Sequence, residues 1–320
     1  MPETFDRTRF ERIAQEGGDR ALTASLAVAV RSGAEAAAAD LAALLLHVAT
    51  IAPEALPEYY DGAAEGWTGR APSAEPIIVG HEGDNGAMSD AFWPAFWALV
   101  LDPEVGRNAG EITVRTAALT ALMSPAFGAR LATTALHYPG VAAALAVGDP
   151  QPFTMAQLTV CPKGSLGGDL HDLIVDNSFD LEVLPRDQLA LSTLPVPLGY
   201  LNSRILQCHD LWHLLAGYDT TILHEVAISA FQLAQFGHHY SSVFLAVTVT
   251  KVALSQPAAL ELMLDTILSG WTHGRETPPL LGLPWEAIWH EPIETIRATH
   301  GVAAFASPYP ANLLELLLAG

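Results

Sequence analysis

Residues 199–236 read GYLNSRILQCHDLWHLLAGYDTTILHEVAISAFQLAQF, and this stretch decides the fold. The apolar segments on both sides of Gly217 are long enough for helices and lack the alternation that is typical of a strand. Gly217 is typical of a helix end, and Asp219 or Thr220 is typical of the N-cap that begins a second helix. The stretch therefore predicts two helices joined by a short turn, which is a helical hairpin.

Alanine- and leucine-rich segments of the same kind occur along most of the chain. Together they predict helices at 20–31, 34–52, 89–101, 111–121, 125–136, 169–176, 199–216, 220–236, 241–254, 256–271 and 285–298. Val, Ile and Thr cluster at 243–250, so the composition leaves a strand open there. The sequence predicts an all-α fold, a multi-helix bundle-like domain whose candidate site lies on the helical hairpin.

Proline and glycine are concentrated in residues 54–88, which we expect to form a linker. The predicted organisation is therefore an N-terminal helical extension with a Pro/Gly-rich linker over residues 1–88. The main helical domain is expected to occupy residues 89–320.

The composition excludes several classes of protein. The 320 residues contain 35 acidic and 15 basic side chains, for a net charge of −20, so no nucleic acid is expected as a partner. The two cysteines, Cys161 and Cys208, are too few for a disulfide framework and fit a reducing compartment. The N-terminus shows no signal peptide, and the uncharged stretch 226–250 is too polar at its centre for a transmembrane helix. We expect a cytoplasmic protein.

Four potential metal ligands are concentrated in the predicted hairpin. On a helix, His209 and His213 lie about 40° apart around the axis. Asp210 lies about 100° from His209 and about 60° from His213. The midpoint between His213 and Glu225 falls in the turn, so an antiparallel hairpin places both side chains roughly 9 Å from the bend. Two imidazoles and two carboxylates then converge, which predicts a metal site.

The donor set narrows the chemistry of this site. Nitrogen and oxygen ligands without thiolate suit Zn, Fe, Mn or Co and do not distinguish among them. The sequence has no dinucleotide-binding, P-loop or nucleophile-elbow motif. An HD-type phosphohydrolase or a metallopeptidase stays open as a weaker alternative, although Asp210 stands where the metallopeptidase motif H-E-x-x-H has Glu.

Three groups of residues resemble motifs of the Coq4 family of ubiquinone-biosynthesis proteins. The ligand candidates match the family's H-D-x-x-H followed by eleven residues and Glu. Residues 162–167 resemble its P-E-G-[ST]-x-G segment, with Lys163 in place of the acid. The residues Trp271, Gly274 and Arg275, and then Trp285, Glu286 and Trp289, resemble its C-terminal patterns. The resemblance covers residues 160–300 and indicates a bacterial-type member with an N-terminal extension.

The resemblance implies a helical fold and a divalent metal, usually zinc. It implies removal of the C1 carboxyl group from a 4-hydroxy-5-polyprenylbenzoate in ubiquinone biosynthesis, with or without coupled hydroxylation. The alternative is a metal-stabilised scaffold that binds prenyl lipid and organises the quinone-biosynthesis complex. The implied partners are a polyprenylated benzoate or quinone precursor and other quinone-biosynthesis proteins, with a location peripheral to the inner membrane. We also expect a homo-oligomer.

Five further residues are candidates for roles around this site. Arg204 could pair with a substrate carboxylate, or it could simply be a solvated charge on the helix. His224 could donate a proton to the substrate, or it could have no role in the reaction. Lys251 could anchor an anionic head group or extend along apolar surface. Trp285 and Trp289, one helical turn apart if the segment is helical, could line an isoprenoid site or simply pack in the core.

Overall fold

The structure, a computed structural model, describes residues 5–80, 88–105, 109–148, 151–181, 194 and 196–319. All regular structure in these residues is helical, in agreement with the predicted all-α fold. The first half contains α1 (Arg7–Glu16), α2 (Arg20–Arg31), α3 (Glu35–Thr50), η1 (Pro53–Ala55), α4 (Leu56–Thr68), α5 (Phe92–Val100), α6 (Ala109–Thr120), α7 (Pro125–Ala135), α8 (Val141–Ala146) and α9 (Met155–Thr159). The second half contains α10 (Leu166–Asn177), α11 (Leu198–Ala216), α12 (Ile222–Phe236), α13 (His239–Ser255), η4 (Pro257–Ala259), α14 (Leu260–Glu276), η5 (Trp285–Ala287), α15 (Ile293–His300) and α16 (Leu313–Ala319).

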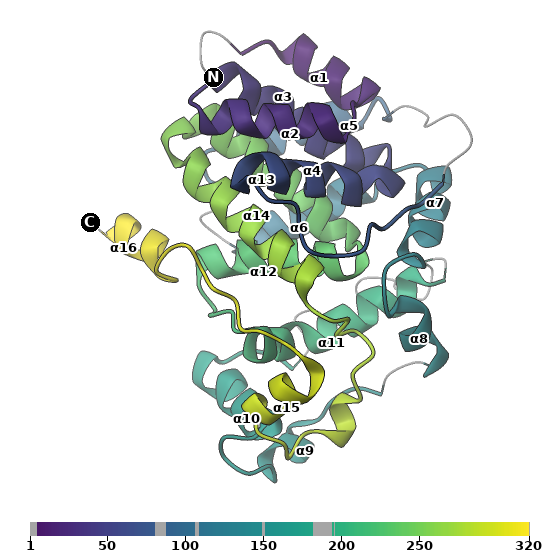
Figure 1. Cartoon of the computed structure of the whole chain (residues 1–320), viewed down its shortest axis with the longest axis vertical. Coiled ribbons are helices and arrows are strands. Elements are labelled where there is room, and N and C mark those ends of the chain that lie inside the picture. Colours follow the sequence, from purple (N-terminus) through teal and green to yellow (C-terminus); the bar gives the residue numbers. More distant parts are fainter. Residues whose placement is uncertain are drawn as a thin grey trace.

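Two hydrophobic cores hold the helices together, and α12 contributes to both of them. The first core contains buried side chains of α1–α6 and α12–α14. The second contains buried side chains of α7–α12 and of residues 280–302. Figure 1 shows the N-terminal helices at one end of the molecule, α9, α10 and α15 at the other, and α11 and α12 between them. Any side chain on the exposed start of α12 is therefore held by a helix that is fixed from two sides.

The segment 54–88 is not simply the predicted linker, because residues 56–68 form α4. Its glycines serve helix packing. A Cβ on Gly62 would lie 2.6 Å from the carbonyl oxygen of Arg20, and one on Gly66 would lie 2.1 Å from that of Ala24. The missing side chains thus let α4 approach the backbone of α2. The helices before residue 69 share the first core with α13 and α14, and the division at residue 88 stays a prediction.

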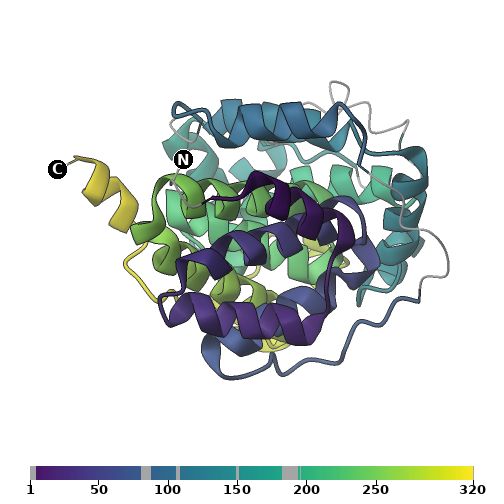
Figure 2. The ribbon, with the colours of Figure 1, turned by 90° about the horizontal axis from the view of Figure 1, so that it is seen from above.

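Two other segments clarify what the sequence left open. Residues 243–250 are helical within α13, which packs between α3 and α6 (Figure 2). The helix predicted at 285–298 is wrong as a single element: it divides into η5 and α15, with Pro292 as the residue before α15. Proline disfavours helix in the residue before it, which explains the break. Trp285 and Trp289 therefore do not lie on one helix.

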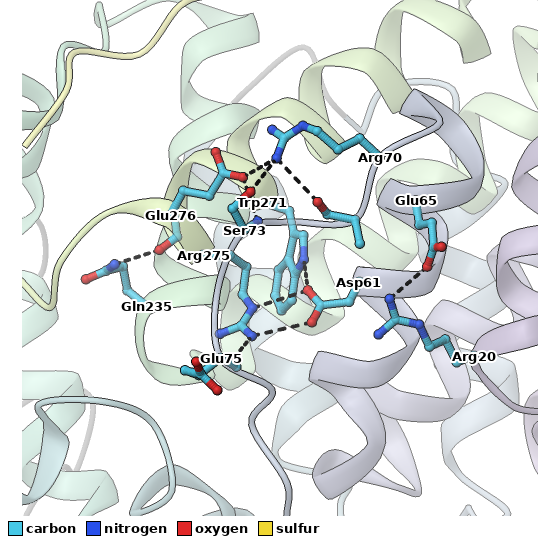
Figure 3. A network of polar contacts seen from close by, with 12 residues as sticks. Arg20, Asp61, Glu65, Arg70, Ser73, Glu75, Gln235, Trp271, Arg275 and Glu276 are labelled. Carbon is cyan, nitrogen blue, oxygen red and sulfur yellow. Dashed lines mark hydrogen bonds and ion pairs between the residues drawn. The ribbon is translucent and has the colours of Figure 1, made fainter.

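Helix α14 connects the two halves of the molecule. A Cβ on Gly270 would lie 2.3 Å from the carbonyl oxygen of Ala227, so α14 lies directly on the backbone of α12. The side chains of Trp271 and Arg275 reach Asp61 of α4, as Figure 3 shows. This network ties the N-terminal helices to α14, which in turn packs on α12.

No single helix among the described residues has both the length and the apolar character needed to cross a bilayer. The helical segments Glu35–Thr50 and Pro53–Thr68 meet those criteria only when taken together, and the chain bends by 119° between them.

Candidate metal centre

The predicted hairpin is present in α11 and α12. Helix α11 ends at Gly217, whose φ of 78° is in the left-handed region that favours glycine. The predicted N-cap at Asp219 or Thr220 is wrong, because Thr221 holds that position and its hydroxyl makes no capping bond. The first N–H of α12, on Ile222, instead donates to Oε1 of Glu315 at 2.7 Å. Glu315 therefore caps the start of α12, although a helix cap usually comes from a residue next to the helix in the sequence.

The hairpin brings His209, His213 and Glu225 into direct contact. The Nε2 atoms of the two imidazoles lie 3.1 Å apart. The carboxylate of Glu225 places Oε2 3.4 Å from Nε2 of His209 and Oε1 3.3 Å from Nε2 of His213. Asp210 joins the two histidines in a second group whose ligand atoms all lie within 4.8 Å of one another. The structure thus brings together all four residues that the sequence singled out.

These separations fit a divalent metal. Ligands about 2.0–2.1 Å from a tetrahedral zinc ion lie roughly 3.3–3.4 Å from each other, close to the distances among the imidazoles and Glu225. The nitrogen and carboxylate donors suit Zn, Fe, Mn or Co equally well. The side chain of Glu225 is 46% exposed, whereas that of His213 is only 2% exposed. The site is therefore buried on the side of His213 and accessible on the side of Glu225.

Two neighbours orient the imidazoles. Nδ1 of His213 donates to the backbone carbonyl of Tyr218 at 3.1 Å, which fixes the ring with its Nε2 facing Glu225. The buried side-chain amide of Gln232 lies 2.7 Å from Nδ1 of His209. Such partners of the outer ring nitrogen are typical of metal-binding histidines, because they fix the orientation of the ring.

Electrostatic interactions couple the four groups. Burial raises the pKa of Glu225, but the hydrogen bonds from His209 and His213 outweigh it and hold the pKa of this carboxyl well below its usual range. Burial lowers the pKa of His209, but Glu225 outweighs it and the pKa is raised. Burial raises the pKa of Asp210, against the attraction of the two imidazoles. The site therefore favours a charged Glu225, the form that can ligate a cation.

The two catalytic candidates lie on the same hairpin. Arg204 is buried in α11, donates to Oε1 of Gln207 at 2.6 Å and to Oε1 of Glu286 at 3.3 Å, and leaves its Nε without a partner in the described part of the chain. His224 is buried beside Glu225; its Nδ1 accepts the N–H of Asp219 at 2.8 Å, and no partner is found for its Nε2 among the described residues. Arg204 is thus not the solvated charge that was the alternative. The catalytic roles of both residues stay predictions.

The three substrate-binding candidates are held by protein contacts. Lys251 donates to the backbone carbonyls of Val100 and Asp102 at the end of α5, away from the hairpin turn. Trp285 and Trp289 are buried in the second core, and neither indole N–H has a partner within the described residues. Packing accounts for their positions, and a role in substrate binding stays a prediction.

Gln232 and the carbonyl of Tyr218 are the parts of the site that the sequence analysis missed. Gln232 lies seven residues after Glu225, which is two helical turns, so both side chains project from one face of α12. A search for polar residues at this spacing could have found it. The Tyr218 carbonyl carries no sequence signal, because every residue has one.

Comparisons with known proteins support the motif resemblance. Residues 150–305 match the family model described as coenzyme Q (ubiquinone) biosynthesis protein Coq4. The mitochondrial ubiquinone biosynthesis protein COQ4 homolog of Drosophila ananassae is 30% identical over 145 residues, which are 44% of this chain and 51% of that protein. Its counterpart from Bos taurus is 25% identical over 154 residues, 46% of this chain and 54% of that protein. The chain thus spans about half the length of the curated relatives it matches.

The fold comparison extends further along the chain. The crystal structure of a candidate ubiquinone biosynthesis protein from Nostoc punctiforme PCC 73102 superposes with a TM-score of 0.51 and 23% identity, covering 67% of this chain and 98% of that one. Two of the family-like segments also touch each other here: the N–H groups of Leu166 and Gly167 donate to the carbonyls of Glu291 and Trp289 at 2.8 and 2.9 Å. Over residues 150–305, the chain is therefore similar to the Coq4 family, as the motif resemblance predicts.

Proposed function

We propose that this chain is a metal-dependent enzyme of ubiquinone biosynthesis that removes the C1 carboxyl group of a 4-hydroxy-5-polyprenylbenzoate. The observation that carries the proposal is a pair of imidazoles 3.1 Å apart, each 3.3–3.4 Å from one carboxylate, on a family-type hairpin. Zinc is the metal that we propose, on the strength of the family, and Fe, Mn or Co would suit the same donors.

The chain's own residues would hold the metal and orient the substrate. His209, His213 and Glu225 would be ligands, and Asp210 is close enough to become a fourth. A bound divalent ion would supply Lewis acidity toward a carboxylate or phenolate. Because Glu225 is the exposed side of the cluster, the substrate would approach from there.

The reaction breaks the bond between C1 and the carboxyl carbon. Carbon dioxide leaves, the electron pair stays on C1, and in the simple reaction a proton takes the place of the carboxylate. In the oxidative reaction, dioxygen instead supplies the hydroxyl oxygen at C1, and its second oxygen atom leaves as water after reduction by an external two-electron donor such as a reduced flavin or nicotinamide. Arg204 and His224 are the residues that we propose to test for substrate pairing and proton delivery.

The test combines metal analysis with a turnover assay on purified protein. The wild type should contain about one equivalent of metal and release carbon dioxide from a short-chain prenyl hydroxybenzoate. His213→Ala and Glu225→Gln should lose both properties. His137→Ala, which changes an exposed histidine just after the end of α7, is the matched control and should keep both. Unchanged turnover in both site variants would refute the proposal, and mass spectrometry of the product would show whether C1 gains hydrogen or hydroxyl.

A scaffold with a structural metal is the second candidate function. Asp210 favours it, because four protein ligands would close the coordination shell and leave no place for substrate. Removal of the metal would then unfold the protein, and the folded protein would bind prenyl lipid without changing it. Turnover by the purified chain would exclude this alternative.

The remaining assignments follow from the same proposal. We propose a prenylated benzoate or quinone precursor and other quinone-biosynthesis proteins as partners, a homo-oligomeric state, and attachment at the periphery of the inner membrane. Light scattering and vesicle flotation of the purified protein would test the last two.

A further inference from the structure

The last turn of α11 is held by residues from a distant part of the chain. A helix leaves its last four carbonyls without partners inside the helix. Arg297 of α15 donates to two of them, the carbonyls of Leu214 and Leu215, at 3.0 and 2.9 Å. The N–H of Phe305 donates to a third, on Ala216, at 2.7 Å. The helix that carries the two histidines is therefore tied at its end to the C-terminal region.

The first turn of α12 is held from the same region. Thr221 precedes this helix without a capping bond from its hydroxyl, and the N–H of Ile222 donates to Oε1 of Glu315 at 2.7 Å. Glu225 lies in the same first turn, three residues after Ile222. The bond to Glu315 therefore fixes the part of α12 that carries the carboxylate of the candidate site.

The chain between these contacts crosses the hairpin turn, and we call residues 297–315 the C-terminal strap. The ring of Phe305 stacks on that of Tyr218, in the turn, with centroids 4.5 Å apart and planes inclined by 21°. The hydroxyl of Tyr309 donates to Oδ2 of Asp265 in α14 at 2.6 Å. Figure 1 shows this part of the chain in yellow, running from α15 toward α16. The strap is thus anchored on a third helix between its contacts with α11 and α12.

The ligand candidates lie at the ends of their helices, where a helix is least stable. His213 is in the last turn of α11, and Glu225 is in the first turn of α12. Helix ends fray because they lack a full set of internal hydrogen bonds. A binding site requires its side chains within about 0.5 Å of the productive geometry. Support from outside the hairpin is therefore needed to keep Nε2 of His213 and Oε1 of Glu225 at their separation of 3.3 Å.

We propose that Glu315 is a positioning residue, which fastens the start of α12 to the C-terminal strap and so keeps Glu225 beside His213 in the geometry of a metal site. The part that concerns metal rests on the proposed function. The fastening of α12 follows from hydrogen bonds within the protein alone. The strap thus belongs to the candidate site, although Glu315 itself is not a ligand.

Asp19 offers a matched comparison on another helix. Its carboxylate accepts the N–H of Leu22, in the first turn of α2, at 2.7 Å, the same length as the bond from Ile222 to Glu315. Helix α2 contains no histidine, cysteine or acidic residue. Loss of the Asp19 cap should therefore lower stability, as loss of Glu315 should, without moving a candidate ligand.

The experiment uses the full chain, stripped of metal with a chelator and titrated with Zn²⁺ and Co²⁺. Glu315→Ala should bind zinc about 10-fold more weakly, the lower end of the loss that is usual for residues that orient metal ligands. Glu315→Gln keeps an oxygen that can accept the N–H of Ile222, so it should restore most of this affinity. Asp19→Ala should lower the denaturation midpoint by a similar amount and keep the wild-type zinc affinity.

Hydrogen exchange of the Ile222 amide, measured by NMR before metal is added, gives a second readout. This N–H should exchange slowly in the wild type and in Glu315→Gln. It should exchange fast in Glu315→Ala, because loss of the acceptor opens the first turn of α12 to water. If Glu315→Ala does not fold, Glu315→Asp takes its place, since its carboxylate is one carbon shorter, and the same two losses are expected.

The outcomes separate the two proposals. Wild-type zinc affinity in Glu315→Ala, or slow exchange of its Ile222 N–H, overturns the role of Glu315. An equal loss of affinity in Asp19→Ala also overturns it, because zinc binding would then follow overall stability. If wild-type protein binds neither Zn²⁺ nor Co²⁺, the proposed function fails, while the exchange of the Ile222 amide still decides whether Glu315 holds α12.

Discussion

Asp61 and Glu225 are two acidic residues in contact with other helices, and their partners differ in kind. Asp61 accepts hydrogen bonds from the indole of Trp271 at 2.9 Å and from the guanidinium of Arg275 at 3.2 and 3.4 Å (Figure 3). Glu225 faces two imidazoles at 3.3 and 3.4 Å. The partners of Asp61 never lose their donors near neutral pH, whereas an imidazole can give up its proton and offer a lone pair instead.

This difference separates a structural site from a candidate reactive one. A carboxylate paired with arginine keeps its hydrogen-bond donors at every pH near neutrality, because the guanidinium does not lose its proton, and so it is not free to bind a cation. A carboxylate paired with imidazoles can bind a metal cation together with them, once the cation replaces the protons on the imidazole nitrogens. Exposure agrees with this distinction, since the Asp61 side chain is 10% exposed and that of Glu225 is 46% exposed.

The largest effect is expected for Asp61→Ala, which would leave the charge of Arg275 buried without its partner. Breaking such a pair typically costs about 3–5 kcal/mol in the free energy of unfolding. Chemical denaturation would measure this loss, and zinc titration of the folded fraction should show wild-type affinity. A parallel loss of zinc affinity would mean that the two sites are not separate in function.

Glu225→Gln should have the opposite profile. We expect a fall in zinc affinity of at least about 100-fold, since a direct ligand counts for more than its outer partners. The metal-stripped variant should unfold at nearly the wild-type denaturant concentration, because the side chain is half exposed. Glu261→Gln, the same change in the first turn of α14, is the control. A large loss of stability in metal-stripped Glu225→Gln would make its cluster a structural network like that of Asp61.

His239 tests what burial does to an imidazole that has no carboxylate beside it. Burial lowers its pKa to about 4, and only its bond to the Ala49 carbonyl opposes this shift. Between the pKa of an unfolded histidine, about 6.5, and this value, the unfolded chain binds more protons than the folded one. His239 should therefore reduce stability progressively as the pH falls from 6.5 to 4, by roughly 2–3 kcal/mol in total.

Denaturation curves of the wild type and of His239→Gln across this range would measure the effect. The variant should show a shallower loss of stability toward acid, and identical slopes would contradict the assignment. His209, whose pKa is raised by Glu225, illustrates the contrast between the two environments.

The smallest effect is expected for Glu65, one helical turn after Asp61 on α4. Its carboxylate pairs with Arg20 at 2.8 Å, with both side chains exposed by more than a third (Figure 3). Exposed ion pairs contribute about 0–1 kcal/mol, so Glu65→Gln should change the unfolding free energy by no more than that. A loss comparable to that of Asp61→Ala would show that the position on α4, and not burial of the charge, determines the cost.

The sequence predicted those parts of the site that depend on local spacing. The histidines are one turn apart, and Gly217 locates the turn, so the hairpin and the contact of Glu225 with both imidazoles followed. The cap on α12 could not be predicted, because Glu315 is 93 positions away from Ile222. The partner of Arg275 was equally inaccessible, since Asp61 is 214 positions away and lies in a segment whose glycines are typical of a linker.

The packing of α14 has a practical consequence for dissecting the protein. One side of this helix lies on the backbone of α12 through Gly270, and the other carries Trp271 and Arg275 toward α4. A fragment cut at residue 150, where the family match begins, would expose an unpaired guanidinium, an indole and the apolar faces of α13 and α14 to water. We expect such a fragment to aggregate, and supplying residues 1–149 as a separate chain should restore its solubility.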